Sequence, residues 1–120
     1  MARILYAEDD PSVAAMVDFR LTDEGHDVTL AGDGDEARRL LEQHTYDVVL
    51  LDIMMPGVDG FALCRELAGR EDPPGILIIS ARDRDEDVRT GMEAGADGYL
   101  IKPFDPQELV DAVEELSPGS

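Results

Sequence analysis

Residues 48–60 read VVLLDIMMPGVDG: four apolar residues, an aspartate, and then a segment that contains Pro56 and Gly57. A run as short and as apolar as 48–51 is typical of a strand that is buried on both faces. Pro56 and Gly57 are turn formers, so a turn is expected to follow this strand. The pattern therefore places Asp52 at the carboxyl end of a buried strand.

Four other short apolar runs lie on either side of this stretch: ILYA at 4–7, VTLA at 28–31, ILII at 76–79 and YLI at 99–101. Amphipathic segments separate the five runs and predict helices over residues 11–24, 34–44, 60–69, 84–94 and 106–116. A strand–helix unit repeated five times with short connections predicts an α/β fold, a doubly wound five-stranded parallel sheet with helices on both faces. We expect the flavodoxin-like strand order 2-1-3-4-5.

Local signals mark several helix ends. Asp10 is a predicted N-cap, and Pro11 follows it at a position where proline suits the first turn of a helix. Val13, Val17 and Leu21 recur at a spacing of four residues, as expected for a helix face that packs on a core. Gly95 is a predicted stop for the helix over 84–94.

Composition limits the class of protein. A chain of 120 residues is expected to form a single domain over 1–120, and SPGS at 117–120 is either the start of a linker or simply the end. No apolar stretch approaches the roughly 20 residues that span a bilayer, and no secretory signal is evident, so we expect a cytoplasmic protein that contacts no membrane. Cys64 is the only cysteine, which excludes an internal disulfide and favours a core position.

The formal net charge of −18 argues against direct nucleic-acid binding by this domain, because phosphate backbones require a basic surface. The acidity is compatible with a salt-rich cytoplasm and equally with ordinary solubility, and the sequence does not separate the two.

Chemically distinctive residues follow four of the five predicted strands. In an open parallel sheet, ligands bind beyond the carboxyl ends of the strands. The residues found there are Glu8, Asp9 and Asp10 after the first strand, Asp52 after the third, Ser80 after the fourth, and Lys102 with Pro103 after the fifth. The second strand, outermost in the expected order, is followed only by Ala31, Gly32 and Asp33.

Three carboxylates at one edge of a sheet need positive charge. Two of them about 4 Å apart repel by roughly 4 kcal/mol at an effective dielectric constant near 20. Lys102, the only lysine in the chain, supplies one positive charge, which does not balance three acids. A divalent cation with oxygen ligands fits the deficit, and Mg²⁺ is the natural candidate because it also accepts phosphate oxygens.

These residues suggest phosphoryl chemistry on Asp52. A carboxylate can act as the nucleophile and form an acyl phosphate, while a metal held by Asp9 and Asp52, assisted by Glu8, neutralises the phosphoryl oxygens. Lys102 is expected to pair with another phosphoryl oxygen, and Ser80 to donate a hydrogen bond to it. Neither a Walker loop nor a G-x-G-x-x-G motif is present, so the phosphoryl donor is expected to be a separate molecule.

The segments ILYAEDD, VVLLDIMMPGVDG, ILIISA and GYLIKPF, in this order, resemble the receiver domain of bacterial two-component response regulators over essentially the whole chain. The resemblance implies that Asp52 is the phospho-acceptor and that Glu8 and Asp9 are the acidic pair, which leaves Asp10 as a helix cap. It also implies a metal ligand from the backbone carbonyl of Met54. The remaining implied roles are a switch hydroxyl on Ser80, an aromatic switch at Tyr99, and a Lys102–Pro103 peptide bond that is usually cis in the family.

The resemblance further implies a function. A sensor histidine kinase, a phosphotransfer protein or a small acyl phosphate is the expected donor, with Mg²⁺ as cofactor and Mn²⁺ as a substitute. Self-dephosphorylation, rather than turnover of another substrate, is the expected chemistry. Phosphorylation adds about −1.5 to −2 charges, and Ser80 and Tyr99 are expected to move in response. The surface of the fourth helix, fifth strand and fifth helix then changes for a partner, an output domain or a homodimer.

Two other functions fit this fold class. A haloacid-dehalogenase-like phosphatase carries a D-x-D motif after its first strand, whereas the candidate nucleophile here follows the third. A flavin or nucleotide binder would need a glycine- or hydroxyl-rich phosphate loop after the first strand, which the sequence lacks. The output stays open at this point between a stand-alone switch, a DNA-binding domain and an enzymatic domain.

Overall fold

The computed structural model describes residues 1–118, so residues 119–120 of the predicted linker start lie outside the described residues. The five strands are β1 (Arg3–Ala7), β2 (Asp27–Ala31), β3 (Val48–Leu51), β4 (Gly75–Ser80) and β5 (Gly98–Ile101). The five helices are α1 (Pro11–Asp23), α2 (Gly34–Gln43), α3 (Gly60–Ala68), α4 (Asp85–Glu93) and α5 (Pro106–Leu116). Every predicted element is confirmed, with boundaries that differ by at most one residue.

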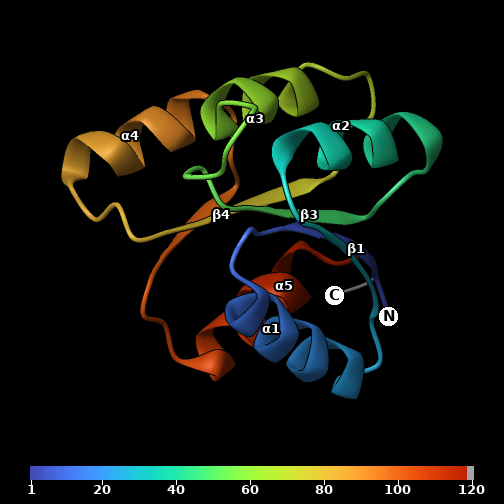
Figure 1. The fold of residues 1–120 in the computed structure, drawn as a ribbon. Helices are drawn as coiled ribbons and strands as arrows, with labels where there is room; N and C mark the ends of the chain where they lie inside the picture. The colour runs from blue at the N-terminus through green and yellow to red at the C-terminus, as the bar shows by residue number, and fades with distance from the viewer. Residues whose placement is uncertain (119–120) are drawn as a thin grey trace.

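The strands form one parallel sheet in the order β2-β1-β3-β4-β5, as the sequence predicted. Helices α2, α3 and α4 cover one face of the sheet, and α1 and α5 cover the other (Figure 1). Strands β1 and β3 lie side by side, with Ala7 paired to Leu51 at their carboxyl ends. This register brings the residues after Ala7 next to the residues after Leu51.

The sheet separates two hydrophobic clusters. Alternate residues of each strand point to opposite faces, so Leu51 packs under α2, α3 and α4 while Leu50 packs under α1 and α5. In β5, Tyr99 packs against the first cluster and Leu100 against the second. The strands that carry the candidate site are thus fixed from both sides.

The predicted helix ends are also confirmed. The side chain of Asp10 accepts hydrogen bonds from the backbone N–H groups of Ser12 and Val13, and Pro11 occupies the first turn. Gly95 follows α4 with φ of 108°, a conformation that glycine adopts without strain. Cys64 is fully buried, in agreement with its predicted core position.

His26 lies in the connection between α1 and β2. It is buried, and its Nδ1 accepts a hydrogen bond of 3.0 Å from the backbone N–H of Ala2. Its Nε2 lies 3.4 Å from a carboxylate oxygen of Glu114 in α5. The residue links the start of the chain to the last helix, a contact between distant segments that local sequence does not reveal.

Candidate functional site

The candidate site lies at the carboxyl ends of β1, β3, β4 and β5. The backbone N–H of Asp52 donates to Ala7 O at 3.1 Å, and the N–H of Glu8 donates to Ala31 O at 2.9 Å. These bonds extend the sheet by one residue past each strand. They fix Glu8 and Asp52 as neighbours at the edge where the sequence placed them.

Lys102 bridges the two buried carboxylates. Its Nζ donates to Oε1 of Glu8 at 2.6 Å and to Oδ2 of Asp52 at 2.9 Å. Glu8 is 3% exposed and Asp52 is 4% exposed, so both acids are almost entirely shielded from solvent. A charge-assisted pair of this length is stronger than a neutral hydrogen bond. The lysine therefore joins β5 to β1 and β3.

Glu8 is held by more than the lysine. The hydroxyl of Tyr6 donates to Oε1 at 2.9 Å, and the backbone N–H of Asp10 donates to Oε2 at 3.2 Å. Sequence reasoning assigned no role to Tyr6, which reads as an ordinary strand residue. The sequence signal available for Tyr6 was its position two residues before Glu8, at the end of a strand. With three donors on its two oxygens, Glu8 is the most constrained acid of the site.

Electrostatics at the site follow from burial and crowding. Burial raises the pKa of the Asp52 carboxyl above its ordinary value, and the Glu8 carboxylate adds to this, while the Met54 N–H and Lys102 act in the opposite direction. Burial acts to lower the pKa of the Lys102 ammonium, but its bonds to Glu8 and Asp52 outweigh that effect and raise it. Burial, followed by the charge of Glu8, raises the pKa of the Tyr6 hydroxyl, which keeps Tyr6 a donor.

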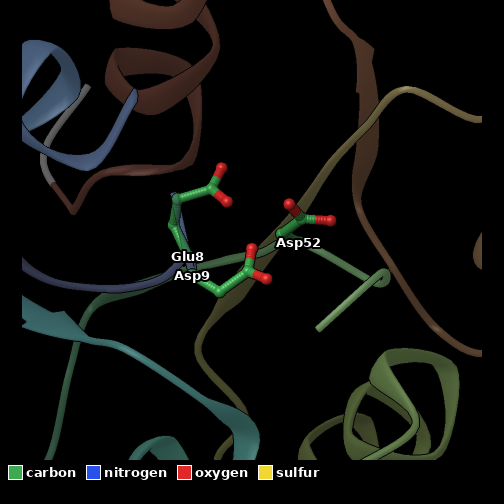
Figure 2. A group of neighbouring side chains, drawn as sticks. All are labelled: Glu8, Asp9 and Asp52. Atoms are coloured by element: carbon green, nitrogen blue, oxygen red, sulfur yellow. The ribbon is translucent and has the colours of Figure 1, made fainter. Parts of the chain in front are cut away.

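Asp9 completes a group of three carboxylates. Single oxygens of Glu8, Asp9 and Asp52 all lie within 4.8 Å of one another. Figure 2 shows the three side chains, with Glu8 and Asp9 coming from the loop after β1 and Asp52 from the end of β3. Asp9, unlike the other two, is exposed. Oxygens on opposite sides of a bound Mg²⁺ lie about 4.2 Å apart, so this spacing and the hard oxygen donors fit such an ion.

Met54 and Pro103 lie at the borders of the site. The backbone N–H of Met54 donates to Oδ1 of Asp52 at 2.9 Å, and the Met54 side chain is 53% exposed. The Met54 N–H therefore contacts Asp52, and the metal ligand expected from the Met54 carbonyl stays a prediction. The Lys102–Pro103 peptide bond is cis, as the resemblance implied.

Ser80 and Tyr99 both form hydrogen bonds with the backbone of Arg82. The Oγ of the buried Ser80 accepts a hydrogen bond of 3.1 Å from the backbone N–H of Arg82. The hydroxyl of the half-buried Tyr99 donates to the carbonyl oxygen of Arg82 at 2.9 Å. Arg82 was not singled out from the sequence, because its role here belongs to its backbone and leaves no mark on its side-chain identity.

A family model described as the response regulator receiver domain matches residues 4–114. The chain belongs to this family of receiver domains. MtrA of Mycolicibacterium smegmatis, described as a DNA-binding response regulator, is 43% identical over 111 residues, which cover 92% of this chain and 48% of MtrA. The receiver domain thus spans about half the length of this curated relative.

Solved receiver domains share the fold. The receiver domain of response regulator 1452 from Francisella is 36% identical, with a TM-score of 0.91 and coverage of 97% of this chain and 96% of the other. The BeF3-activated N-terminal receiver domain of RstA from Klebsiella pneumoniae is 34% identical, with a TM-score of 0.88 and coverage of 94% and 96%. Membership of the receiver family implies phosphorylation-dependent signalling in a two-component system.

Across residues 1–118 no helix combines the length and the apolar character that crossing a bilayer demands.

Proposed function

We propose that this receiver domain is a signalling switch in which Asp52 accepts a phosphoryl group from a sensor histidine kinase or a phosphotransfer protein. The observation that carries the proposal is the position of Asp52. Its buried carboxylate is bonded to Lys102 and lies within 4.8 Å of oxygens of Glu8 and Asp9. The assignment of residues 1–120 to one domain, of 117–120 to a linker start, and of the protein to the cytoplasm stays a prediction.

In the proposed reaction, a carboxylate oxygen of Asp52 attacks the phosphorus atom of the donor. The bond between phosphorus and the donor's leaving group breaks, and an acyl phosphate forms. Lys102 Nζ already lies 2.9 Å from Oδ2, so its charge is in place for a phosphoryl oxygen as the group arrives. Reversal to the resting state is the attack of water on the same phosphorus, which returns inorganic phosphate and the free carboxylate.

The residues that would hold Mg²⁺, or Mn²⁺ in its place, are Asp9, Asp52 and the carbonyl of Met54, with Glu8 beside them. When bound, the ion supplies a Lewis acid that neutralises charge on the transferring group. Glu8 already receives bonds from Tyr6, Lys102 and Asp10, so we assign it the lesser share of coordination. The exposed Asp9 is the acid best placed to take up an ion from solvent.

The switch that follows is proposed to act through Arg82. Ser80 Oγ is free to donate to a phosphoryl oxygen once it rotates away from the Arg82 N–H. The Arg82 carbonyl holds the hydroxyl of Tyr99, whose ring packs against the first core cluster, so a shift of the Arg82 backbone would change the position of Tyr99. A Tyr99→Ala variant is expected to be phosphorylated normally but to lose the response of α4, β5 and α5. A full response in that variant would remove Tyr99 from the mechanism.

Two kinds of partner are compatible with a changed surface on α4, β5 and α5: a second copy of this chain in a homodimer, and a different protein or output domain. MtrA is described as DNA-binding, and on that likeness a DNA-binding output in the same polypeptide is one such partner. We propose no direct contact of this acidic domain with nucleic acid.

The test is incubation with acetyl phosphate and Mg²⁺, followed by intact mass. We expect a gain of one phosphoryl group that EDTA prevents, that hydroxylamine reverses, and that Asp52→Asn abolishes. Asp47→Asn is the matched control, because Asp47 lies at the opposite end of β3 and bonds the N–H of Arg3. Labelling that persists in Asp52→Asn, or that is equally lost in Asp47→Asn, would contradict the proposed acceptor.

A further inference from the structure

Tyr6 is a fully buried residue of β1 whose hydroxyl reaches the candidate site. Strand β1 lies between β2 and β3, where Tyr6 is paired with Leu30 and Leu50. The ring belongs to the hydrophobic cluster under α1 and α5, which includes Val17 of α1 and Leu109 of α5. Neighbours from two strands and two helices therefore hold the ring, and the hydroxyl has a fixed position.

Tyr6 shares one face of the sheet with charged residues of the site. Alternate residues of a strand point to the same face, and both Ile4 and Tyr6 belong to the cluster under α1 and α5. Sheet hydrogen bonds continue one residue past β1 and β3, so Glu8 and Asp52 keep to this face as well. The Tyr6 hydroxyl thus meets the Glu8 carboxylate from within the core, at 2.9 Å.

The hydrogen bonds to Glu8 divide its two oxygens unequally. A carboxylate offers about four acceptor positions, two on each oxygen. Oε1 receives the Tyr6 hydroxyl at 2.9 Å and the Lys102 ammonium at 2.6 Å, which occupies both of its positions. Oε2 receives the backbone N–H of Asp10 at 3.2 Å. The acceptor position left on this carboxylate for an ion, or for a water bound to an ion, is therefore on Oε2.

The Tyr6 hydroxyl keeps the carboxylate in this orientation. Without it, one position on Oε1 would face an apolar ring at a residue that is 3% exposed. An unpaired buried acceptor is costly, so the carboxylate would turn towards another donor. Lys102, which bonds both Glu8 and Asp52, is the side-chain donor within reach. Loss of the hydroxyl would thus disturb the acids and the lysine together.

We propose that Tyr6 is a positioning residue for the ion site: its hydroxyl holds Oε1 of Glu8, leaves Oε2 available beside Asp9 and Asp52, and so strengthens Mg²⁺ binding by this group. The inference rests on the proposed function in that Mg²⁺ is taken as the ion. Tyr6 acts through Glu8 and has no contact of its own with the ion or the phosphoryl group.

Tyr6→Phe removes the hydroxyl and keeps the ring. Calorimetric Mg²⁺ titration of the unphosphorylated chain is expected to show roughly tenfold weaker binding, the lower end of the usual loss when a residue that orients a metal ligand is changed. Tyr46→Phe is the matched control, because Tyr46 precedes β3, at the opposite end of the sheet, and its ring lies against Arg3 and His44. Unchanged affinity in Tyr6→Phe, or an equal loss in Tyr46→Phe, would overturn the proposal.

Phosphorylation kinetics separate positioning from general damage. Intact-mass time courses with acetyl phosphate are run at rising Mg²⁺ concentrations. In Tyr6→Phe the half-saturating Mg²⁺ concentration is expected to rise about tenfold, while the rate at saturating Mg²⁺ stays close to that of the parent chain. A lower saturated rate with the same half-saturating concentration would make Tyr6 a core residue only and overturn the proposal.

The two proposals fail in different ways. A parent chain that gains no phosphoryl group from acetyl phosphate would contradict Asp52 as acceptor. The calorimetric comparison of Tyr6→Phe with the parent chain involves no phosphorylation, so it decides the role of Tyr6 independently.

A double-mutant cycle tests whether Tyr6 acts through Glu8. Glu8→Ala removes the carboxylate that accepts the Tyr6 hydroxyl. Adding Tyr6→Phe to Glu8→Ala is expected to cause no further loss of Mg²⁺ affinity, as for two residues that act as a unit. A further loss as large as the one in the parent background would mean that Tyr6 acts by another route, and would overturn the assignment.

The parent chain provides a measurement that needs no folded variant of Tyr6. With tyrosine labelled in the ring, we follow the NMR resonances of Tyr6 and Tyr46, first in EDTA and then with Mg²⁺ added. The Tyr6 resonances are expected to shift as the ion changes the charge on Glu8, while those of Tyr46 stay in place. Tyr6 resonances that do not move at saturating Mg²⁺ would overturn the proposal.

Discussion

Asp9 and Asp10 are adjacent and carry the same side chain, yet the structure places them in different surroundings. Asp9 contributes an oxygen to the group with Glu8 and Asp52. Asp10 caps α1 by accepting from the N–H groups of Ser12 and Val13. A carboxylate that satisfies backbone donors contributes to stability, whereas one that crowds other carboxylates contributes to ion binding.

The two aspartates are therefore expected to separate stability from metal affinity. Asp10→Ala should lower the free energy of unfolding by about 1 kcal/mol, the usual cost of a lost N-cap, and leave Mg²⁺ affinity nearly unchanged. Asp9→Ala should weaken Mg²⁺ binding at least tenfold, on the order of one lost carboxylate ligand, with little loss of stability. Urea unfolding and calorimetric Mg²⁺ titration measure the two effects, and the opposite pattern would exchange the two roles.

Asp52 is expected to destabilise the fold at neutral pH. Burial, with Glu8 nearby, raises its pKa in the folded state above the ordinary value of 3.8. The folded protein therefore holds this proton more tightly than the unfolded chain, and the stability it provides is lost as pH rises through the folded pKa.

In EDTA at pH 7, Asp52→Asn should accordingly be more stable than the parent chain by on the order of 1 kcal/mol. The difference should shrink as the pH falls below 3.8, where the Asp52 carboxyl is mostly protonated in both the folded and the unfolded state. Thermal melts across this range provide the measurement. A parent chain that is the more stable of the two at pH 7 would show that the Lys102 bond outweighs the crowding.

At the scale of elements, the loop between β3 and α3 carries the acceptor and is fixed by a close approach. A Cβ on Gly60, the first residue of α3, would lie 2.5 Å from the Cα of Ile53, the residue after Asp52. The contact is with backbone, so no side-chain rotation relieves it. The start of α3 therefore sets the position of the segment that contains Asp52 and Met54.

Gly60→Ala is expected to lower stability by about 1–3 kcal/mol, the scale of overpacking in a well-packed interior, and to slow phosphorylation of Asp52 by acetyl phosphate. Gly69→Ala is the control, because Gly69 has φ of −81° and its added Cβ would meet nothing closer than 3.4 Å. Unfolding and intact-mass time courses report both effects. If Gly60→Ala matched the parent chain in stability and in the rate of Asp52 phosphorylation, α3 would be able to shift and accept the added methyl group at little cost.

The order of elements could be predicted because each strand is a short buried run and each helix an amphipathic one. Val48–Leu51 and Pro106–Leu116 begin and end where the pattern placed them. The acids and Lys102 could be assigned to one edge because parallel strands end together. The remaining contacts join distant residues through backbone atoms, as in Arg82 with Ser80 and Tyr99, or through buried rings, as in His26 with Ala2. Such contacts leave no periodic signal.

At the scale of the whole molecule, a net charge of −18 on 120 residues opposes compaction. The described ion pairs offset only part of it, and several of them join exposed side chains, as in Arg38 with Glu66 and Arg84 with Glu86. Pairs of this kind contribute little individually. Repulsion among the excess carboxylates therefore lowers the stability of the folded state as a whole.

Salt is expected to raise the melting temperature. Screening shortens the range of repulsion from about 10 Å at 0.1 M to about 3 Å at 1 M, and a gain of about 1 kcal/mol corresponds to roughly 4 °C at this size. Calorimetry in rising NaCl, with sucrose as an uncharged control, measures the effect. A strong salt requirement would favour adaptation to a salt-rich cytoplasm, whereas a flat response would favour solubility as the reason for the acidity.

The division of the interior into two clusters has a mechanical consequence. Helix α4 packs on one side of the sheet and α5 on the other, and β5 gives Tyr99 to the first and Leu100 to the second. A ligand that contacts both α4 and α5 would couple the two sides of the sheet, which otherwise open independently of each other. Unfolding should then become more cooperative in the complex, and amide exchange should slow on both sides of the sheet together, even in strands that the ligand never touches.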